Sequence, residues 1–376
     1  MSPFLFVYFW IMKKSIAFIL CFGLLSCGVT KQSTRPAYKL KFLDEYIIPA
    51  NSSFNNLKIG GLSGIDFKND TLYLIDDRST KPIIYTLKWK SFYSKIEKLS
   101  FIESINLKET DEVFRKKSMD LESIRIGNDS NFWLSSEGNI NASKNPSIFQ
   151  IDTQGNFLKE MKLPNYFKVG GNNYPISNRF FEAMTWDHEN KNIWAATELP
   201  LQFDGSIPQL WKTYSPVRFT EFNTATGEAK QQFTYNLDRV VRVPLLPFYV
   251  NGITEILSLS KNEFLVVERS FSAGRGKRSN RIKLFLANKS GAVNTLTREK
   301  LSKRDEIVLA KKELLLDFKK IRKQIPSKRI DNIEGLCFGP TLANGNKTLL
   351  FVSDNNFNSF GDQITQIIWI EIIDIR

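Results

Sequence analysis

Glu122-Ser123-Ile124, followed by Trp133-Leu-Ser-Ser-Glu137, is one copy of a two-part pattern that occurs five times and decides the fold. A polar, small, apolar triplet precedes a short apolar run that ends in a carboxylate. The triplets begin at Ser63, Glu122, Glu182, Asn251 and Glu334, and the runs end at Asp76, Glu137, Glu198, Glu268 and Asp354. The triplets start 59, 60, 69 and 83 residues apart. A repeat of this length, built from short β-rich segments, is typical of a stacked or circular array.

The repeats read as blades of a β-propeller. A third apolar run follows each carboxylate, and a fourth is visible in some copies, such as residues 227–237. Four antiparallel strands per unit predict an all-β propeller of five four-stranded blades, with a sixth, degenerate blade between Ala292 and Phe318 as an open alternative. A β-sandwich is the competing fold, but it gives no reason for five similar units. The strand expected at residues 38–48 should pair with residues 367–373 and close the ring.

The carboxylates are expected to share one face of the propeller. Neighbouring antiparallel strands place the start of one beside the end of the next, so both acids of each repeat should lie at the mouth of the central channel. The predicted cluster is Asp76, Glu122, Glu137, Glu182, Glu198, Glu268, Glu334 and Asp354. So many carboxylates at close range require cations. Candidates are Ca²⁺, which takes about six to eight oxygen ligands, and the side chains of Arg78, Arg179 and Arg269.

Several segments in this order resemble the phytase-like family, also called "esterase-like activity of phytase". They are Gly60-Gly-Leu-Ser-Gly-Ile-Asp66, Asp120-Leu-Glu-Ser-Ile124, Phe181-Glu-Ala-Met184, Asn251-Gly-Ile-Thr-Glu255, Val267-Glu-Arg269 and Asp331-Asn-Ile-Glu-Gly-Leu336. The resemblance covers roughly residues 38–376. It implies a propeller of the bacterial cell envelope with phosphomonoester or ester hydrolase activity. A basic insertion near residues 298–329 departs from the family pattern and leaves the substrate open.

Two functions follow from these observations. In the first, the protein is a Ca²⁺-dependent phosphomonoesterase or esterase for an anionic small molecule. Its catalytic residues would be Glu122, Glu182, Glu334, Arg78 and Arg269, and its metal ligands Asp76, Glu137, Glu198, Glu268 and Asp354. In the second, it is a non-enzymatic envelope propeller that binds a ligand or partner, and the acids hold the blades together. The single histidine, His188, lies in a polar stretch that reads as a turn between the first two strands of its blade, on the face opposite the carboxylates. A Ser-His-Asp hydrolase or a His-rich zinc site is therefore not expected.

The N-terminus predicts a lipid anchor. Met12-Lys13-Lys14 and an apolar stretch precede Leu24-Leu25-Ser26-Cys27, which resembles the lipobox of a bacterial lipoprotein. Residues 1–27 are therefore interpreted as a signal peptide, with Met12 as an alternative start and a plain signal anchor as the alternative reading. Residues 28–37 are a polar tether, and residues 38–376 the propeller. We expect a monomer of the cell envelope, attached to the membrane through Cys27 and facing the periplasm.

The positive charge is unevenly placed. The formal net charge is +13, and residues 298–329 carry twelve Lys or Arg against five acids. A second basic loop, residues 275–281, follows the run that ends at Glu268 and should overhang the carboxylate face. It would attract a polyanionic substrate or anionic lipid headgroups. Nucleic acid is not expected as a partner, because no aromatic and basic binding face is visible.

Overall fold

The computed structural model describes residues 37–78, 81–108, 111–116, 119–176, 180–358 and 362–375, which belong to one compact unit. The predicted signal peptide, Cys27 and Arg179 lie outside the described residues. So do residues 28–36 of the predicted tether. Within the described ranges, no helix is long and apolar enough to cross a membrane.

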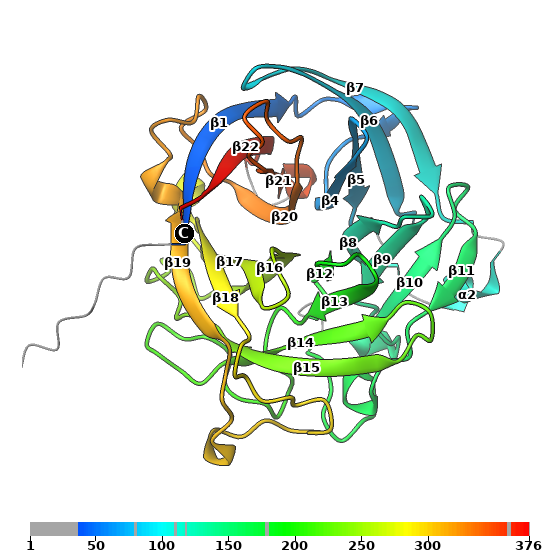
Figure 1. Ribbon diagram of the computed structural model, residues 1–376, viewed down its shortest axis with the longest axis vertical. Coiled ribbons are helices and arrows are strands. Elements are labelled where there is room, and N and C mark those ends of the chain that lie inside the picture. The colour runs from blue at the N-terminus through cyan, green and yellow to red at the C-terminus, as the bar shows by residue number, and fades with distance from the viewer. Residues whose placement is uncertain are drawn as a thin grey trace, which may run out of the picture. The chain divides into compact units, whose positions relative to one another are not determined.

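The unit is a five-bladed β-propeller (Figure 1), as the five repeats predicted. Each blade is a four-stranded antiparallel sheet. From the axis outward, the first blade is β4 (Leu62–Lys68), β5 (Thr71–Asp76), β6 (Ile83–Phe92) and β7 (Lys95–Asn106). The second is β8 (Leu121–Ile126), β9 (Phe132–Ser136), β10 (Ser147–Ile151) and β11 (Phe157–Glu160). The third is β12 (Ala183–Trp186), β13 (Asn192–Ala196), β14 (Pro216–Asn223) and β15 (Ala229–Asn236).

The last two blades complete the ring. The fourth blade is β16 (Tyr249–Ser258), β17 (Glu263–Ser272), β18 (Asn280–Asn288) and β19 (Lys311–Asp317). The fifth is β20 (Asn332–Phe338), β21 (Thr348–Asp354), β22 (Thr365–Asp374) and β1 (Tyr38–Ile48). The first strands contact one another around the axis, β4 with β8, β8 with β12, β12 with β16, β16 with β20, and β20 with β4.

The N-terminal strand closes the propeller as predicted. β1 pairs antiparallel with β22, from Tyr38 opposite Asp374 to Ile48 opposite Thr365. The fifth blade therefore joins the two ends of the propeller, which ties the first described residues to the last. The segment proposed for a sixth blade instead supplies the outer strand of the fourth, because β19 pairs with β18. The short elements, a β2–β3 hairpin (Ser53–Phe54 and Leu57–Lys58) and helix α2 (Glu112–Lys116), lie in the connections between blades.

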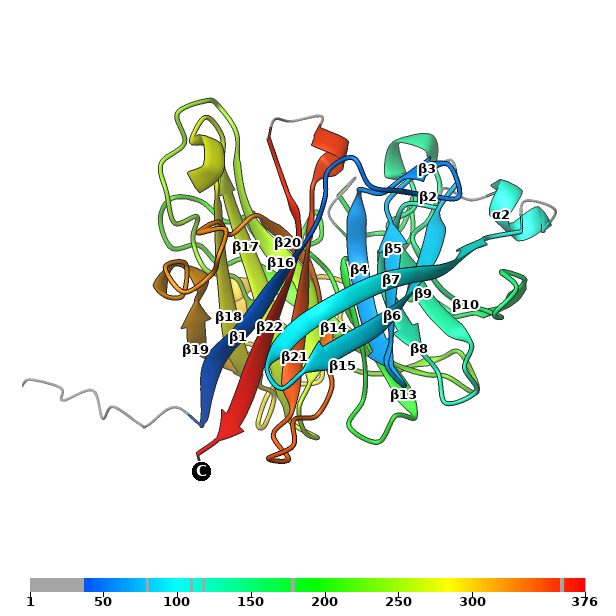
Figure 2. The ribbon, with the colours of Figure 1, turned by 90° about the horizontal axis from the view of Figure 1, so that it is seen from above.

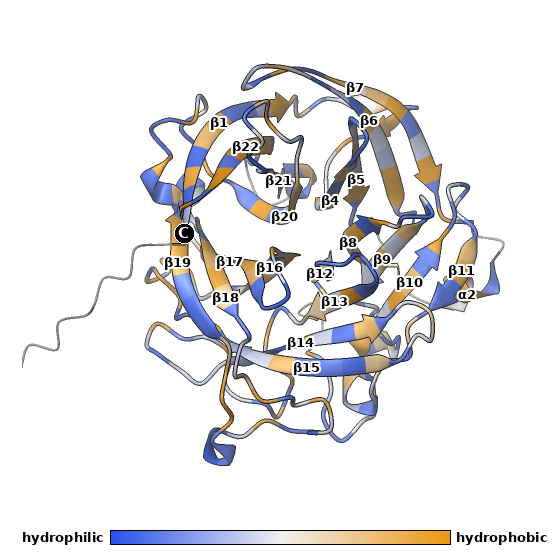
Figure 3. Cartoon of the chain, in the orientation of Figure 1, coloured by the Kyte–Doolittle hydropathy of each residue, from blue (hydrophilic) through white to orange (hydrophobic). Residues whose placement is uncertain are grey.

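Five clusters of buried apolar side chains fill the spaces between neighbouring blades. Figure 3 shows both apolar and polar residues along outer strands such as β7, in which buried Ile96, Leu99 and Ile105 stand among more exposed residues. Cys337 belongs to the cluster between the fifth and first blades and has no exposed surface, so it packs in the core. Among the described residues, this unit therefore has a core that runs through all five blades.

Candidate functional site

A β-bulge shapes the inner strand of four blades. The pairing of first and second strands shifts between Leu62 and Gly64, Leu121 and Ser123, Ile253 and Glu255, and Ile333 and Gly335. The unpaired residues at these shifts are Ser63, Glu122, Thr254 and Glu334, and β12 begins directly after Glu182. A bulge re-aims the side chain of its extra residue. These five positions form the inner row of the site.

The bulge in β16 shows that the predicted position of the fourth triplet is wrong. The predicted triplet began at Asn251, but the equivalent of Glu122 in the fourth blade is Thr254, three residues further along β16. Ser63 and Thr254 use their hydroxyls to donate hydrogen bonds to the neighbouring inner strand, at 2.6 Å to the Leu121 carbonyl and 3.1 Å to the Ile333 carbonyl. The inner row therefore has hydroxyls that join blades at two positions and carboxylates at three.

The second row comes from the ends of the second strands, and it differs from the prediction by one residue in two blades. Leu121 pairs with Ser136 and Ile333 with Ser353, so the acids Glu137 and Asp354 come one residue after the pair. Leu62 instead pairs with Asp76 itself, and Ile253 with Glu268 itself. Because successive side chains of a strand point to opposite faces, a shift of one residue changes the face. The second row is Asp77, Glu137, Glu198, Arg269 and Asp354.

Asp76 and Glu268 consequently serve packing within and between blades. Asp76 forms a 2.8 Å ion pair with Arg78 and accepts hydrogen bonds from the Ile83 amide and the Tyr85 hydroxyl. Glu268 accepts bonds from Tyr235, Asn251, Lys312 and the Asp238 amide, at 2.6 to 3.0 Å. The structure thus does not bring these two predicted ligands into the cluster. Arg78, predicted to contact substrate, donates to Asp76, Tyr85 and the Lys58 carbonyl.

The acids that do converge are those of the second blade and its neighbours. Asp120, Glu122 and Glu137 each place one carboxylate oxygen within 4.8 Å of the other two, close enough to share a metal ion. Within the described ranges, no lysine or arginine forms an ion pair with any of the three. Neither Asp120 nor Asp77 is among the ligands predicted from the sequence. Each lies within two residues of a predicted acid, and only the strand register shows which of them faces the site.

Burial and the crowding of carboxylates raise the pKa values of several acids in the site. Burial, followed by repulsion from Asp354, Asp120 and Asp76, raises the pKa of Asp77 to about 7. Burial raises the pKa of Asp120 to about 6 and that of Glu137 to about 8, although the Phe180 amide donates to Glu137. The pKa values of Glu122 and Glu182 lie well above the ordinary range, because burial and the carboxylates around them both oppose ionisation. The site therefore holds protons near neutral pH or requires a cation.

Arg269 supplies positive charge to the other side of the mouth. It occupies the fourth-blade position where the other second-row residues are acids. Its guanidinium donates to Glu334 and Asn332 and lies 3.7 Å from Glu198. Burial raises the pKa of Asp354 to about 6, and Arg269 is among the groups that oppose the rise. The negative charge of the mouth is therefore balanced unevenly. Arg269 pairs with Glu334 and Glu198, while the second-blade triad has no such partner among the described residues.

A buried ion pair forms the floor of the mouth. Arg125 and Glu255, both almost fully buried, are 2.9 Å apart on the axis side of β8 and β16. The guanidinium also donates to the carbonyls of Ile65, Ile256 and Leu336, on the inner strands of three other blades. Glu255 accepts bonds from the Ser123 hydroxyl and the Met184 amide. All five inner strands therefore contribute a side chain or a backbone group to this hydrogen-bonded network at the axis.

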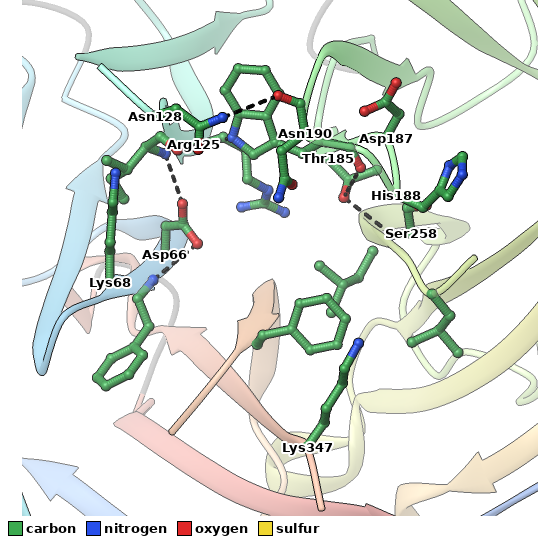
Figure 4. A pocket seen from close by; sticks show the side chains of 16 residues that line it. Asp66, Lys68, Arg125, Asn128, Thr185, Asp187, His188, Asn190, Ser258 and Lys347 are labelled. Carbon is green, nitrogen blue, oxygen red and sulfur yellow. Dashed lines mark hydrogen bonds between the residues drawn. The ribbon is translucent and has the colours of Figure 1, made fainter. Parts of the chain in front are cut away.

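A second cavity, of about 370 Å³, lies on the other side of this floor (Figure 4). Arg125 points toward it, and Asp66, Lys68, His188 and Lys347 stand around it. His188 belongs to the β12–β13 turn, on the face opposite the carboxylates, as predicted. This cavity contains none of the predicted site residues, so the acids and the lone histidine belong to separate sites.

The fold and the site together define a five-bladed β-propeller with an acidic mouth, whose negative charge Arg269 balances only in part. The chain belongs to the phytase-like family, described as "esterase-like activity of phytase", whose model matches residues 57–357. No curated protein sequence matches the chain.

Similar solved structures are distant. A GH62 α-L-arabinofuranosidase catalytic domain of Coprinopsis cinerea is 8% identical with a TM-score of 0.43, over 89% of this chain and 96% of that one. An exo-1,5-α-L-arabinanase from a bovine ruminal metagenomic library is 8% identical with a TM-score of 0.41, over 81% and 90%. Hydrazine synthase of Kuenenia stuttgartiensis is 10% identical with a TM-score of 0.35, over 80% of this chain and 66% of that chain.

Proposed function

We propose that the protein is a metal-dependent hydrolase of phosphomonoesters or esters that acts at the acidic mouth. The observation that carries this proposal is the second-blade triad of Asp120, Glu122 and Glu137, whose oxygens converge within 4.8 Å. Family membership supports the same reaction class through its description as esterase-like. The active site would lie on one side of the ring, where Glu182 and Asp77 are neighbours of the triad.

The residues present fit a hard divalent cation such as Ca²⁺. The donor set is made only of carboxylate oxygens, which hard cations prefer. One oxygen of Glu334, Oε2, is buried with no hydrogen-bond partner among the described residues, so the mouth contains unsatisfied acceptor capacity beyond the triad. Asp120, Glu122 and Glu137 would hold the ion, with Glu182 and Asp77 beside them. A bound cation would supply Lewis-acid polarisation of a substrate oxygen.

The chain's own groups provide proton transfer and orientation. Burial, followed by repulsion from Glu198 and Glu137, raises the pKa of Glu182 well above its ordinary value, which favours the protonated form of this side chain. A protonated carboxyl beside the triad can donate to a leaving oxygen as a general acid. Arg269 donates to Glu334 and Asn332 and lies 3.7 Å from Glu198, and it is the cation at the mouth that would meet an anionic substrate. Arg78 is engaged by Asp76 and Tyr85, so we assign it to packing.

A non-enzymatic binding propeller is the second candidate. The contacts of Glu268 with four donors, and those of Arg269 with Glu334, are of the kind expected if the acids hold blades together. In that case the triad would hold a structural ion or bind a ligand without turnover. Fold alone does not separate these functions.

The deciding experiment combines metal binding with turnover. The purified unit of residues 37–376 is melted with chelator and with Ca²⁺, and assayed against panels of phosphomonoesters and carboxylic esters. The variant carries Glu122→Gln and Glu137→Gln, and the matched control is Glu97→Gln on the outer strand β7. We expect Ca²⁺ to raise the Tm and support turnover in the parent and the control but not in the double variant.

Two other outcomes would argue against a calcium-dependent hydrolase. A Ca²⁺-dependent Tm without turnover on either panel would support the binding propeller. No Ca²⁺ response in the parent protein would contradict a calcium site and leave the acids with packing roles.

A further inference from the structure

Two neighbouring connections of the fourth blade form one ledge, which we call the double loop. It consists of residues 241–248, between β15 and β16, and residues 273–279, between β17 and β18. The Leu245 amide donates to the Ala273 carbonyl at 2.8 Å, and the Ala273 amide donates to the Phe248 carbonyl at 2.9 Å. Arg275 Nε donates to the Val243 carbonyl at 2.6 Å. These hydrogen bonds hold the two loops in a fixed relation.

The tip of the double loop is apolar and open to solvent. The exposed fraction is 61% for Val243, 67% for Leu245, 59% for Leu246 and 48% for Phe248. Single exposed apolar residues are ordinary, but several in one short segment mark an interaction surface. Pro244 and Pro247 lie among them, and proline restricts the backbone, so the tip is presented in a limited set of conformations.

Five arginines gather at the double loop. Arg242, Arg275 and Arg278 belong to the double loop, and Arg281 and Arg322 stand beside it. Burial lowers the pKa of Arg242, and repulsion from the other four arginines lowers it further. Among the described residues only Arg281 of the five forms an ion pair, with Asp317. Nε of Arg281 and Nε of Arg322 are buried with no hydrogen-bond partner in the described part of the chain. The cluster therefore has unused donors and uncompensated charge.

We propose that the double loop is a docking surface for a membrane that contains anionic phospholipid. Arginine is suited to phosphate, because its planar guanidinium donates two parallel hydrogen bonds. Each basic side chain near an anionic leaflet adds attraction, and inserted apolar side chains add affinity that salt does not screen. A soluble anion would use the arginines but would leave the four apolar side chains without a role. The inference does not depend on the proposed hydrolase activity.

Docking would also orient the propeller. Both loops leave the strands at the ends that carry the mouth, since the bulge of β16 and Arg269 of β17 lie there. In Figure 2 the yellow-green loops of this blade extend beyond the upper end of β17. Binding through the double loop would therefore turn the acidic mouth toward the bilayer.

The test is co-sedimentation of the unit of residues 37–376 with vesicles. This unit has its own core and excludes the predicted lipid anchor. The vesicles are phosphatidylcholine alone or phosphatidylcholine with phosphatidylglycerol, each at low and high salt. The variants are Arg278→Glu and the pair Leu245→Ser with Leu246→Ser. The matched controls are Lys98→Glu and Phe92→Ser, exposed residues of the first blade.

We expect binding only with phosphatidylglycerol. Arg278→Glu should weaken it about tenfold or more at low salt, because the variant replaces an attractive charge by a repulsive one. The leucine pair should weaken it several-fold at both salt concentrations, and the controls should bind as the parent does.

Three results would overturn the proposal. Equal binding to both vesicle types would contradict a requirement for anionic lipid. Loss of binding in Arg278→Glu together with unchanged binding of the leucine pair, and competition by millimolar inorganic phosphate, would instead identify a site for free anions. Failure of the folded parent protein to bind either vesicle would exclude a membrane role for the double loop.

Discussion

Arg269 donates to Glu334 across the boundary between the fourth and fifth blades, at a position of the second row that is an acid in every other blade. Replacing Arg269 by Gln should destabilise the metal-free protein by about 3–5 kcal/mol, because a partly buried carboxylate loses its charged partner. Chemical denaturation with chelator measures this change. The exposed Arg278→Gln is the control and should alter stability by less than about 0.5 kcal/mol. Equal effects of the two substitutions would show that the Glu334 contact contributes little.

The stability of the metal-free protein should fall as the pH rises from 5 to 8. Asp77, with a pKa of about 7, and Glu137, with a pKa of about 8, bind protons more tightly in the folded state than in the unfolded chain. A folded state that holds more protons loses stability as protons become scarce. Melting curves with chelator at pH 5 and pH 8 test this, and Ca²⁺ should reduce the difference. A chelated protein that melts higher at pH 8 would contradict the folded-state pKa values.

Gly252→Ala should disturb Glu198. A Cβ atom at position 252 would lie 2.5 Å from Oε1 and 2.6 Å from Cγ of Glu198. The carboxylate would have to move, and we expect a loss of about 1–3 kcal/mol, as for an overpacked core position. Shortening the acid with Glu198→Asp in the same protein should restore part of the loss. A double-mutant cycle measures this coupling, and strictly additive effects would mean that the two residues do not compete for space.

Removing residues 37–48 should lower the Tm of the whole unit or abolish its cooperative melt. β1 completes the fifth blade by pairing with β22 along most of its length, and it contributes Tyr38, Leu43 and Ile48 to the buried core. Calorimetry of the truncated protein is the measurement. Removal of residues 1–36 alone serves as the control and should leave the melt unchanged. A cooperative melt at the parent temperature after loss of β1 would contradict the role of this strand in closure.

Cys27→Ser should release the full-length protein from the membrane fraction. The lipobox-like Leu24-Leu25-Ser26-Cys27 predicts that Cys27 carries the lipid. Palmitate labelling followed by fractionation in a bacterial host tests it, with Cys21→Ser as the matched control. Labelling of the Cys27→Ser protein would exclude this anchor. Residual attachment without labelling would agree with docking through the double loop.

The repeat pattern was sufficient to predict the fold, because each blade restates the same strands and the closing strand followed from the alternation in residues 38–48. The site was harder to predict, because the pairing register of the strands decides to which face each side chain points. Asp76 and Asp77 are consecutive acids at the end of a strand, and only the pairing of Leu62 with Asp76 shows that Asp77 occupies the second row. Similarly, Asn251-Gly252-Ile253 resembles the other triplets, although the bulge at Thr254 sets the true position.

Arg125 and Glu255 lie between the acidic mouth and the cavity that Lys68 and Lys347 line. Their buried ion pair occupies the axis, so we expect the acidic mouth and the cavity around Lys68 and Lys347 to be filled and emptied each from its own side. We therefore expect the propeller to hold two separate sites rather than one continuous channel. Its two ends can respond to different molecules at the same time, and any influence of one on the other has to travel through the inner strands that Arg125 holds together.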